Sequence, residues 1–114
     1  MSAITTHVLD TSRGRPASGV AVTLELEGGS GVWQQIGKGV TDADGRATDL
    51  LLESHNLTAG VYRLAFQTEP YFVSQAVETF YREVVIVFRV GDPAQHYHVP
   101  LLLSPFGYST YRGS

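Results

Sequence analysis

The sequence has 114 residues, which predicts a single folded domain over residues 1–114 and leaves no room for a second. Hydrophobic residues make up 43% and charged residues 17%, with 12 Gly and 5 Pro, a composition typical of a globular chain rich in turns and not of a disordered or fibrous one. The net charge of −3, with Lys and Arg dispersed, argues against nucleic acid as a partner, and the lack of cysteine excludes disulfides and thiolate chemistry.

The sequence shows neither a targeting signal nor a membrane span. Its first ten residues, MSAITTHVLD, lack the basic and apolar regions of a secretory signal. The longest apolar run, residues 84–88, is far shorter than the roughly 20 residues that a membrane-spanning helix needs. We therefore expect a cytoplasmic protein without a membrane partner.

Short apolar runs separated by Gly, Pro, Asp or Asn recur along the chain, and this pattern predicts an all-β sandwich of two packed sheets. The alternation is clearest in residues 20–27, which indicates a strand with one buried face. About eight strands are expected, among them residues 4–10, 20–27, 32–40, 61–68, 83–90, 97–103 and 108–112. One short helix is expected within residues 71–80, behind Pro70, where the alternation is lost.

The segment Asp42-Ala43-Asp44-Gly45 predicts a turn directly before Arg46. It resembles the start of a calcium-binding loop, and Glu53 even falls at the twelfth position. The glycine is misplaced for such a loop, however, and Arg46 occupies the fifth position, where a ligand is required. We therefore interpret the segment as a turn.

Two histidines lie where strand alternation turns their side chains away from the core. His7 shares a face with Thr5 and Leu9, and His98 is opposite the apolar face of its own strand. An imidazole with a pKa near 6.5 can take or give a proton at neutral pH, so both are candidate general bases. A lone histidine is more often a surface or structural residue, and we keep that interpretation for His55.

The pair His96-x-His98 places two imidazoles on the same side of a strand, as some zinc sites require. A catalytic zinc needs a third protein ligand, which only His7 or a remote carboxylate could supply. Zinc therefore stays an alternative, and the main expectation is a site with no metal and no cofactor.

The C-terminal segment, residues 108–114, is open to two interpretations. It predicts either an edge strand protected by a charge or one wall of a polar pocket. The wall would be built by Tyr111, Arg112 and Ser114. The residue pattern alone favours neither.

Three segments together carry a family pattern. They are His7-Val8-Leu9-Asp10 with Arg13-Gly14-Arg15-Pro16-Ala17, then Thr41-Asp42-x-Asp44-Gly45-Arg46, and finally the sequence from His96 to Ser114, which ends in Tyr-Arg-Gly-Ser. This pattern resembles the 5-hydroxyisourate hydrolase family, the transthyretin-related proteins of purine breakdown, over essentially the whole chain. The resemblance implies a transthyretin-like two-sheet β-sandwich that assembles as a homotetramer, a dimer of dimers with active sites in a channel between the dimers.

The resemblance also implies a reaction, the hydrolytic opening of the six-membered ring of 5-hydroxyisourate to give 2-oxo-4-hydroxy-4-carboxy-5-ureidoimidazoline on the route from urate to allantoin. It places seven residues around this substrate: His7, Arg46, His98, Tyr111, Arg112, Gly113 and Ser114. All seven match the residue types of the family.

Each group has an expected role in that reaction. His7 and His98 would hold and deprotonate the attacking water, with the Ser114 hydroxyl as a proton relay. Arg46 would bind and polarise the substrate carbonyls, and the tyrosine and arginine of the terminal Tyr-Arg-Gly-Ser would orient the flat ring.

The main alternative is a transthyretin-like carrier that binds a small apolar ligand in the same channel, lined by Leu9, Pro100 and Leu102. The polar residues argue against it, because burying them beside an apolar ligand would leave them unpaired at about 1 to 3 kcal/mol each. A purely structural β-domain would leave the terminal tetrapeptide without a role.

Overall fold

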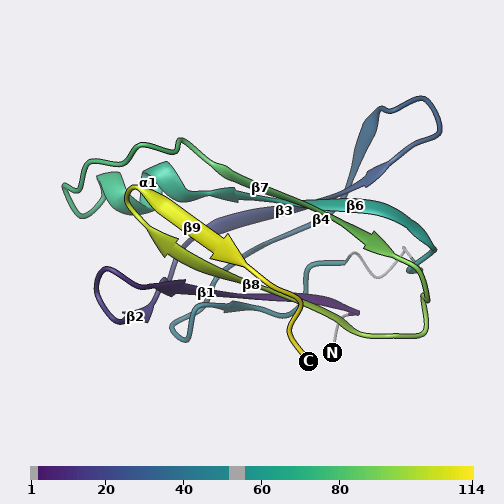
Figure 1. Cartoon of the computed structure of the whole chain (residues 1–114), viewed down its shortest axis with the longest axis horizontal. Helices are drawn as coiled ribbons and strands as arrows, with labels where there is room; N and C mark the ends of the chain where they lie inside the picture. Colours follow the sequence, from purple (N-terminus) through teal and green to yellow (C-terminus); the bar gives the residue numbers. More distant parts are fainter. Residues whose placement is uncertain (1–2, 52–55) are drawn as a thin grey trace.

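A computed structural model describes residues 3–51 and 56–114, which form two packed β-sheets and one short helix (Figure 1). In chain order the elements are β1 (Ile4–Asp10), β2 (Arg15–Pro16), β3 (Ala21–Glu27), β4 (Trp33–Val40), β5 (Arg46–Ala47), β6 (Gly60–Gln67), α1 (Thr68–Val73), β7 (Val84–Val90), β8 (Tyr97–Ser104) and β9 (Gly107–Thr110). The predicted all-β sandwich of two sheets with one short helix is confirmed.

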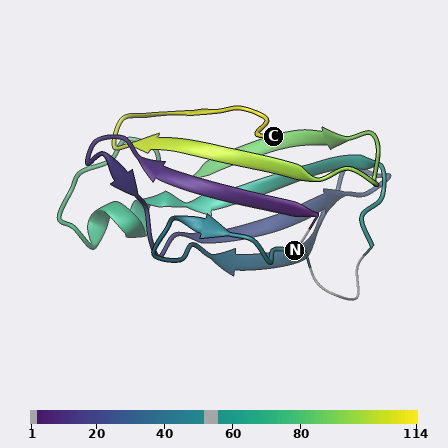
Figure 2. The same ribbon diagram turned by 90° about the horizontal axis from the view of Figure 1, so that it is seen from below.

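One sheet has the strand order β2-β1-β8-β9, with β5 also paired to β1, and the other has the order β4-β3-β6-β7. The strands β1 and β8 run parallel, whereas the other pairs are antiparallel. The sheet with β3, β6 and β7 lies above the sheet with β1 and β8 in Figure 1, and the view from below shows β1 and β8 side by side (Figure 2). Because β1 and β8 are neighbours, residues that are about ninety positions apart in the sequence lie side by side.

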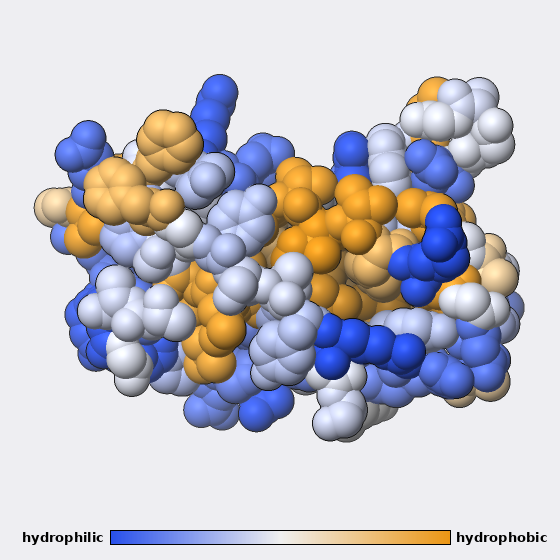
Figure 3. Space-filling view, viewed as in Figure 1, coloured by the Kyte–Doolittle hydropathy of each residue, from blue (hydrophilic) through white to orange (hydrophobic). Residues whose placement is uncertain are grey.

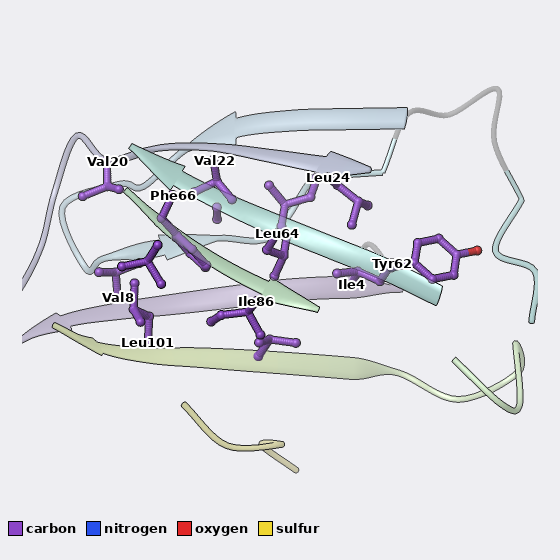
Figure 4. Packing of buried hydrophobic residues seen from close by; sticks show 14 of the residues in the cluster. Ile4, Val8, Val20, Val22, Leu24, Tyr62, Leu64, Phe66, Ile86 and Leu101 are labelled. Atoms are coloured by element: carbon purple, nitrogen blue, oxygen red, sulfur yellow. The ribbon is translucent and has the colours of Figure 1, made fainter. Parts of the chain in front are cut away.

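The core lies between the two layers and is built from alternate residues of each strand (Figure 4). Ile4 and Val8 of β1 and Leu101 of β8 meet Leu24 of β3 and Phe66 of β6, and all five side chains are fully buried. The predicted buried face of residues 20–27 is therefore confirmed. The same alternation leaves the second face of β1 and β8 on the outside of the sandwich.

About eight strands were expected and nine are present among the described residues; the seven expected ranges match β1, β3, β4, β6, β7, β8 and β9, with ends that differ by at most two residues. Two two-residue strands, β2 and β5, follow turns and were not expected as strands. They form because both pair with β1, β2 across the turn that follows β1 and β5 through a long-range contact, and local alternation reveals neither pairing. Glu53 and His55 lie outside the described residues.

The helix prediction is correct only in part, because α1 covers Thr68–Val73 and not residues 71–80. Pro70 lies in the first turn of α1, where a backbone N–H is not needed. The helix ends early because Ala76 adopts φ +57 and the N–H of Val77 donates to the carbonyl of Phe72 at 3.0 Å, a left-handed C-terminal motif. Among the described residues, no helix is long and apolar enough to cross a membrane.

Candidate functional site

The outer face of the sheet that contains β1, β5 and β8 gathers the polar residues singled out from the sequence. Strand pairing places His7 directly opposite Arg46 of β5, and Thr5 directly opposite His98 of β8. Ile4, Thr6 and Val8 of β1 point into the core with no exposed surface, so His7 and Thr5 belong to the other face. Three distant segments of the chain thus meet at the middle of β1.

The turn before β5 brings Arg46 to this face. The Asp42 carboxylate accepts hydrogen bonds from the backbone N–H groups of Arg46 at 3.0 Å and Asp44 at 2.9 Å, and the hydrogen bond from Arg46 is the main reason why the pKa of Asp42 is lowered. Gly45 has φ +75, and a Cβ there would lie 2.3 Å from the Val8 carbonyl oxygen. The predicted turn is confirmed, and the absence of a side chain at Gly45 allows β5 to lie close to β1.

His7 is half-buried and held by one hydrogen bond. Its Nε2 lies 2.8 Å from the backbone carbonyl oxygen of Asp44. A carbonyl only accepts, so Nε2 carries the proton and donates it. With its proton on Nε2, an uncharged imidazole has its lone pair at Nδ1, which can face a substrate or a water molecule.

His98 is half-buried on β8, and its Nδ1 lies 2.8 Å from Thr5 Oγ1. Its pKa is lowered, first by burial and then by the positive charge of Arg46, with further contributions from His7 and His96 when those rings are protonated, against a smaller opposing effect of a hydrogen bond to the Thr5 backbone. The ring is therefore neutral at pH 7, and a neutral imidazole has the lone pair that a general base needs.

The C-terminal segment closes one side of His98. The Gly113 N–H donates to the His98 carbonyl at 2.8 Å, and the two residues form a β-bridge. A Cβ on Gly113 would lie 2.6 Å from Cδ2 of the His98 ring, which is too close for any other residue type without movement. Glycine at this position lets the end of the chain lie against the imidazole.

The side chains around Gly113 are arranged less tightly. Arg112 lies with its guanidinium 4.6 Å from the centre of the Tyr97 ring and donates to Gln95 Oε1 at 2.8 Å. Tyr111 is 57% exposed, and Ser114 is exposed beside Gly113. The structure thus groups His7, Arg46, His98 and Gly113 closely, and it leaves Tyr111, Arg112 and Ser114 exposed at the margin of that group.

A cavity of about 250 Å³ lies between β7 and the β8–β9 pair. His98, Tyr111 and Arg112 contribute to its lining together with apolar residues such as Ile86 and Val99. Apolar surface gathers over β7 and beside it (Figure 3). The cavity therefore joins the polar group to an apolar edge of the sandwich.

The hydroxyl of Thr5 contacts both His96 and His98, which the sequence did not predict. Thr5 Oγ1 lies 2.9 Å from His96 Nε2 as well as 2.8 Å from His98 Nδ1. Alternation placed Thr5 on the face of His7, but only the parallel pairing of β1 with β8 brings it to the two rings. Within the described ranges, no three His, Asp or Glu residues are grouped to hold a metal ion.

Comparisons with known proteins match the chain to one family and to solved structures of the same fold. The model of the HIUase/Transthyretin family matches residues 4–113. The 5-hydroxyisourate hydrolases of Salmonella typhimurium and Mus musculus are 46% and 45% identical to the chain; the alignments cover 97% and 99% of this chain and 80% and 96% of the respective relatives. The structure of Klebsiella pneumoniae 5-hydroxyisourate hydrolase superposes with a TM-score of 0.83 at 39% identity, covering 97% of this chain and 98% of that one. Sea bream transthyretin in complex with thyroxine gives a TM-score of 0.90 at 37% identity, covering 98% of this chain and 95% of that one.

Proposed function

The chain belongs to the HIUase/Transthyretin family, and from this premise we propose that it is a 5-hydroxyisourate hydrolase of urate breakdown. It opens the six-membered ring of 5-hydroxyisourate with water to give 2-oxo-4-hydroxy-4-carboxy-5-ureidoimidazoline. The observation that carries the proposal is the grouping of His7, Arg46 and His98 on one outer sheet face, with Gly113 packed against His98.

The reaction needs a base for the water and a positive group for the charge that develops on the substrate oxygen. His7 and His98 each leave one ring nitrogen available to hold and deprotonate the water. Arg46, paired with His7 across the strands, binds and polarises the substrate carbonyls. Every step uses side chains of this chain, and the scheme includes no metal and no cofactor.

The C-terminal residues complete the substrate site in this proposal. Tyr111 and Arg112 orient the flat ring, Gly113 contributes backbone at the wall, and the Ser114 hydroxyl relays a proton. Their support is positional, because Gly113 is bonded to His98 and its neighbours in sequence are exposed beside it. Exposed side chains are free to contact a bound ligand.

A transthyretin-like carrier is the alternative that the fold itself allows, since the sandwich superposes on a transthyretin that binds thyroxine. The fold therefore does not separate the two activities. The polar residues do, because an apolar ligand would leave the second ring nitrogens of His7 and His98 and the Arg46 guanidinium without a ligand partner, at about 1 to 3 kcal/mol for each buried unpaired group. The relatives that are named as hydrolases point the same way.

We also propose that one domain over residues 1–114 assembles as a homotetramer, a dimer of dimers whose active sites lie in the channel between dimers. The support is an edge strand with exposed apolar residues, since Val87 of β7 is 57% exposed and Phe80 just before it is 72% exposed. Light scattering that gives a monomer at assay concentration would contradict this assembly. The cytoplasmic location stays a prediction.

The test of function uses fresh 5-hydroxyisourate, produced from urate by urate oxidase. The protein is expected to accelerate the loss of the substrate's ultraviolet absorbance. Deletion of residues 111–114 is expected to abolish this acceleration and to leave the β-type circular dichroism intact. An intact protein without effect on the decay would disprove the hydrolase proposal, and full activity of the shortened chain would disprove the role of the terminal residues.

A further inference from the structure

Thr5 can determine which nitrogen of the His98 ring carries the proton, because it lies opposite His98 on the neighbouring strand and its hydroxyl contacts Nδ1 of that ring. Its side chain belongs to the outer face of β1, yet the residue is only 3% exposed. Its two hydrogen-bond partners among the described residues are His98 Nδ1 at 2.8 Å and His96 Nε2 at 2.9 Å. One hydroxyl group therefore connects the two imidazoles.

A threonine hydroxyl has one proton to donate, whereas it can accept two hydrogen bonds. If it donates to His98 Nδ1, the neutral His98 ring must carry its proton on Nε2, and the outward nitrogen has no lone pair. If it donates to His96 Nε2, it must accept from Nδ1–H of His98, and Nε2 of His98 is then free. Accepting from both rings would leave a buried hydroxyl proton without a partner, which is unfavourable.

We propose that Thr5 is a positioning residue that sets the tautomer of His98. The Thr5 hydroxyl donates its proton to His96 and accepts the Nδ1 proton of His98, which leaves the lone pair of His98 at Nε2. This inference deepens the proposed hydrolase function and rests on it, because it selects His98 as the base that deprotonates the water.

The surroundings of the three residues support this direction of the hydrogen bonds. His98 is kept neutral chiefly by burial and by the positive charge of Arg46, so its ring has one proton that must be placed on one nitrogen. His96 is exposed and lies outside the proposed substrate contacts. It is therefore suited to be the acceptor that fixes the hydroxyl proton, while His98 faces the substrate.

Two substitutions of Thr5 separate the hydroxyl from the shape of the side chain. Thr5→Val keeps the size and branching but removes the hydroxyl, and it is expected to lower kcat by about tenfold with little change in KM, because the tautomer affects the chemical step more than binding. Thr5→Ser restores the hydroxyl and is expected to restore most of the activity. The matched control is Thr6→Val, since Thr6 is the next residue of β1 but donates to the Val99 carbonyl on the core side.

Two substitutions of His96 test the direction of the hydrogen bond. His96→Gln retains an acceptor for the Thr5 hydroxyl and is expected to keep most of the activity. His96→Leu removes that acceptor, so the hydroxyl can donate to His98 Nδ1 and drive the ring to the wrong tautomer. A lower kcat is therefore expected for Leu but not for Gln at this position.

Nitrogen NMR of the His98 ring reads the tautomer without any assay of activity. The wild-type protein is expected to show the proton on Nδ1, and Thr5→Val and His96→Leu are expected to move it toward Nε2, whereas Thr6→Val is not. A wild-type ring protonated at Nε2, or an unchanged ring in Thr5→Val, would overturn the inference. Wild-type turnover of 5-hydroxyisourate in the same experiments would show that the hydrolase proposal survives that outcome, whereas absence of turnover in the wild type would remove the function itself.

Discussion

The two ends of β1 both carry polar groups, but those groups have different numbers of hydrogen-bond partners. At one end, the Asp10 carboxylate is 1% exposed and accepts four hydrogen bonds, from the Ser12 N–H and hydroxyl, the Arg13 N–H and the Tyr71 hydroxyl. Toward the other end, His7 and His98 each use one ring nitrogen and are half-buried. The Asp10 carboxylate, whose hydrogen-bonding capacity is filled by the protein, stabilises the fold. The two histidines each keep one ring nitrogen that can take part in a reaction.

Asp10 illustrates how a charge can be buried without being functional. Three of its four hydrogen bonds come from backbone or side-chain donors of the turn that follows β1, and the fourth, from Tyr71, connects it to α1. Burial and then the hydrogen bond to Asp10 raise the pKa of Tyr71, so the phenol keeps its proton and donates it. The carboxylate thus connects α1 to the end of β1 by a hydrogen bond.

The largest expected effect is at the reactive end of β1. His98→Ala and Arg46→Ala are each expected to lower kcat for 5-hydroxyisourate by about a hundredfold or more, the scale of removing a positioned base or an oxyanion partner. Unfolding temperatures are expected to stay close to the wild type, because neither residue belongs to the buried core. The ultraviolet decay assay and a thermal melt measure the two effects, and wild-type turnover in either variant would remove that residue from the mechanism.

A smaller effect is expected where the end of the chain meets His98. Gly113→Ala would place a methyl group 2.6 Å from Cδ2 of the ring, so either the imidazole or the terminal segment must move. We expect kcat to fall by about tenfold, since misplacement of a catalytic group by a fraction of an ångström is costly. Assays at saturating substrate measure it.

Gly107→Ala is the matched control for Gly113→Ala. Gly107 begins β9 on the same hairpin, and an added Cβ would meet only Ser104 Oγ at 3.7 Å, an ordinary contact. Its activity is expected to stay close to the wild type. Equal activity of the two alanine variants would show that the close approach of Gly113 to His98 has no catalytic consequence.

The sandwich could be predicted because alternation is a local property of the sequence. Residues 4–10 show it well, and this strand was placed with correct ends and with the correct face of His7. The pairing of strands is not local, so the parallel contact of β1 with β8 and the short strand β5 could not be derived in the same way. The early end of α1 was missed because an alanine, not a glycine, adopts the left-handed conformation at position 76.

From the sequence, we could predict only those site residues that their chemical type or the family pattern indicates. His7, Arg46 and His98 are chemically conspicuous, and the structure places them together. Thr5 and Gly113 were harder, because their importance lies in what they touch: a threonine that connects two imidazoles, and a glycine that leaves space for one. Such roles depend on distances across the fold that no single segment encodes.

At the saturated end of β1, substitution is expected to change stability and not turnover. Asp10→Ala removes the acceptor of four hydrogen bonds and is expected to lower the free energy of unfolding by about 3 kcal/mol, because buried donors lose their partner. Tyr71→Phe removes only one of these bonds and is expected to cost about 1 kcal/mol. Denaturant unfolding measures both values.

With both variants kept folded well below their unfolding temperatures, kcat is expected to match the wild type, because neither residue contacts the face that carries His7. A folded Tyr71→Phe protein with a several-fold lower kcat would show that the two ends of β1 are coupled, and that saturation of hydrogen bonds does not by itself separate structural from reactive groups.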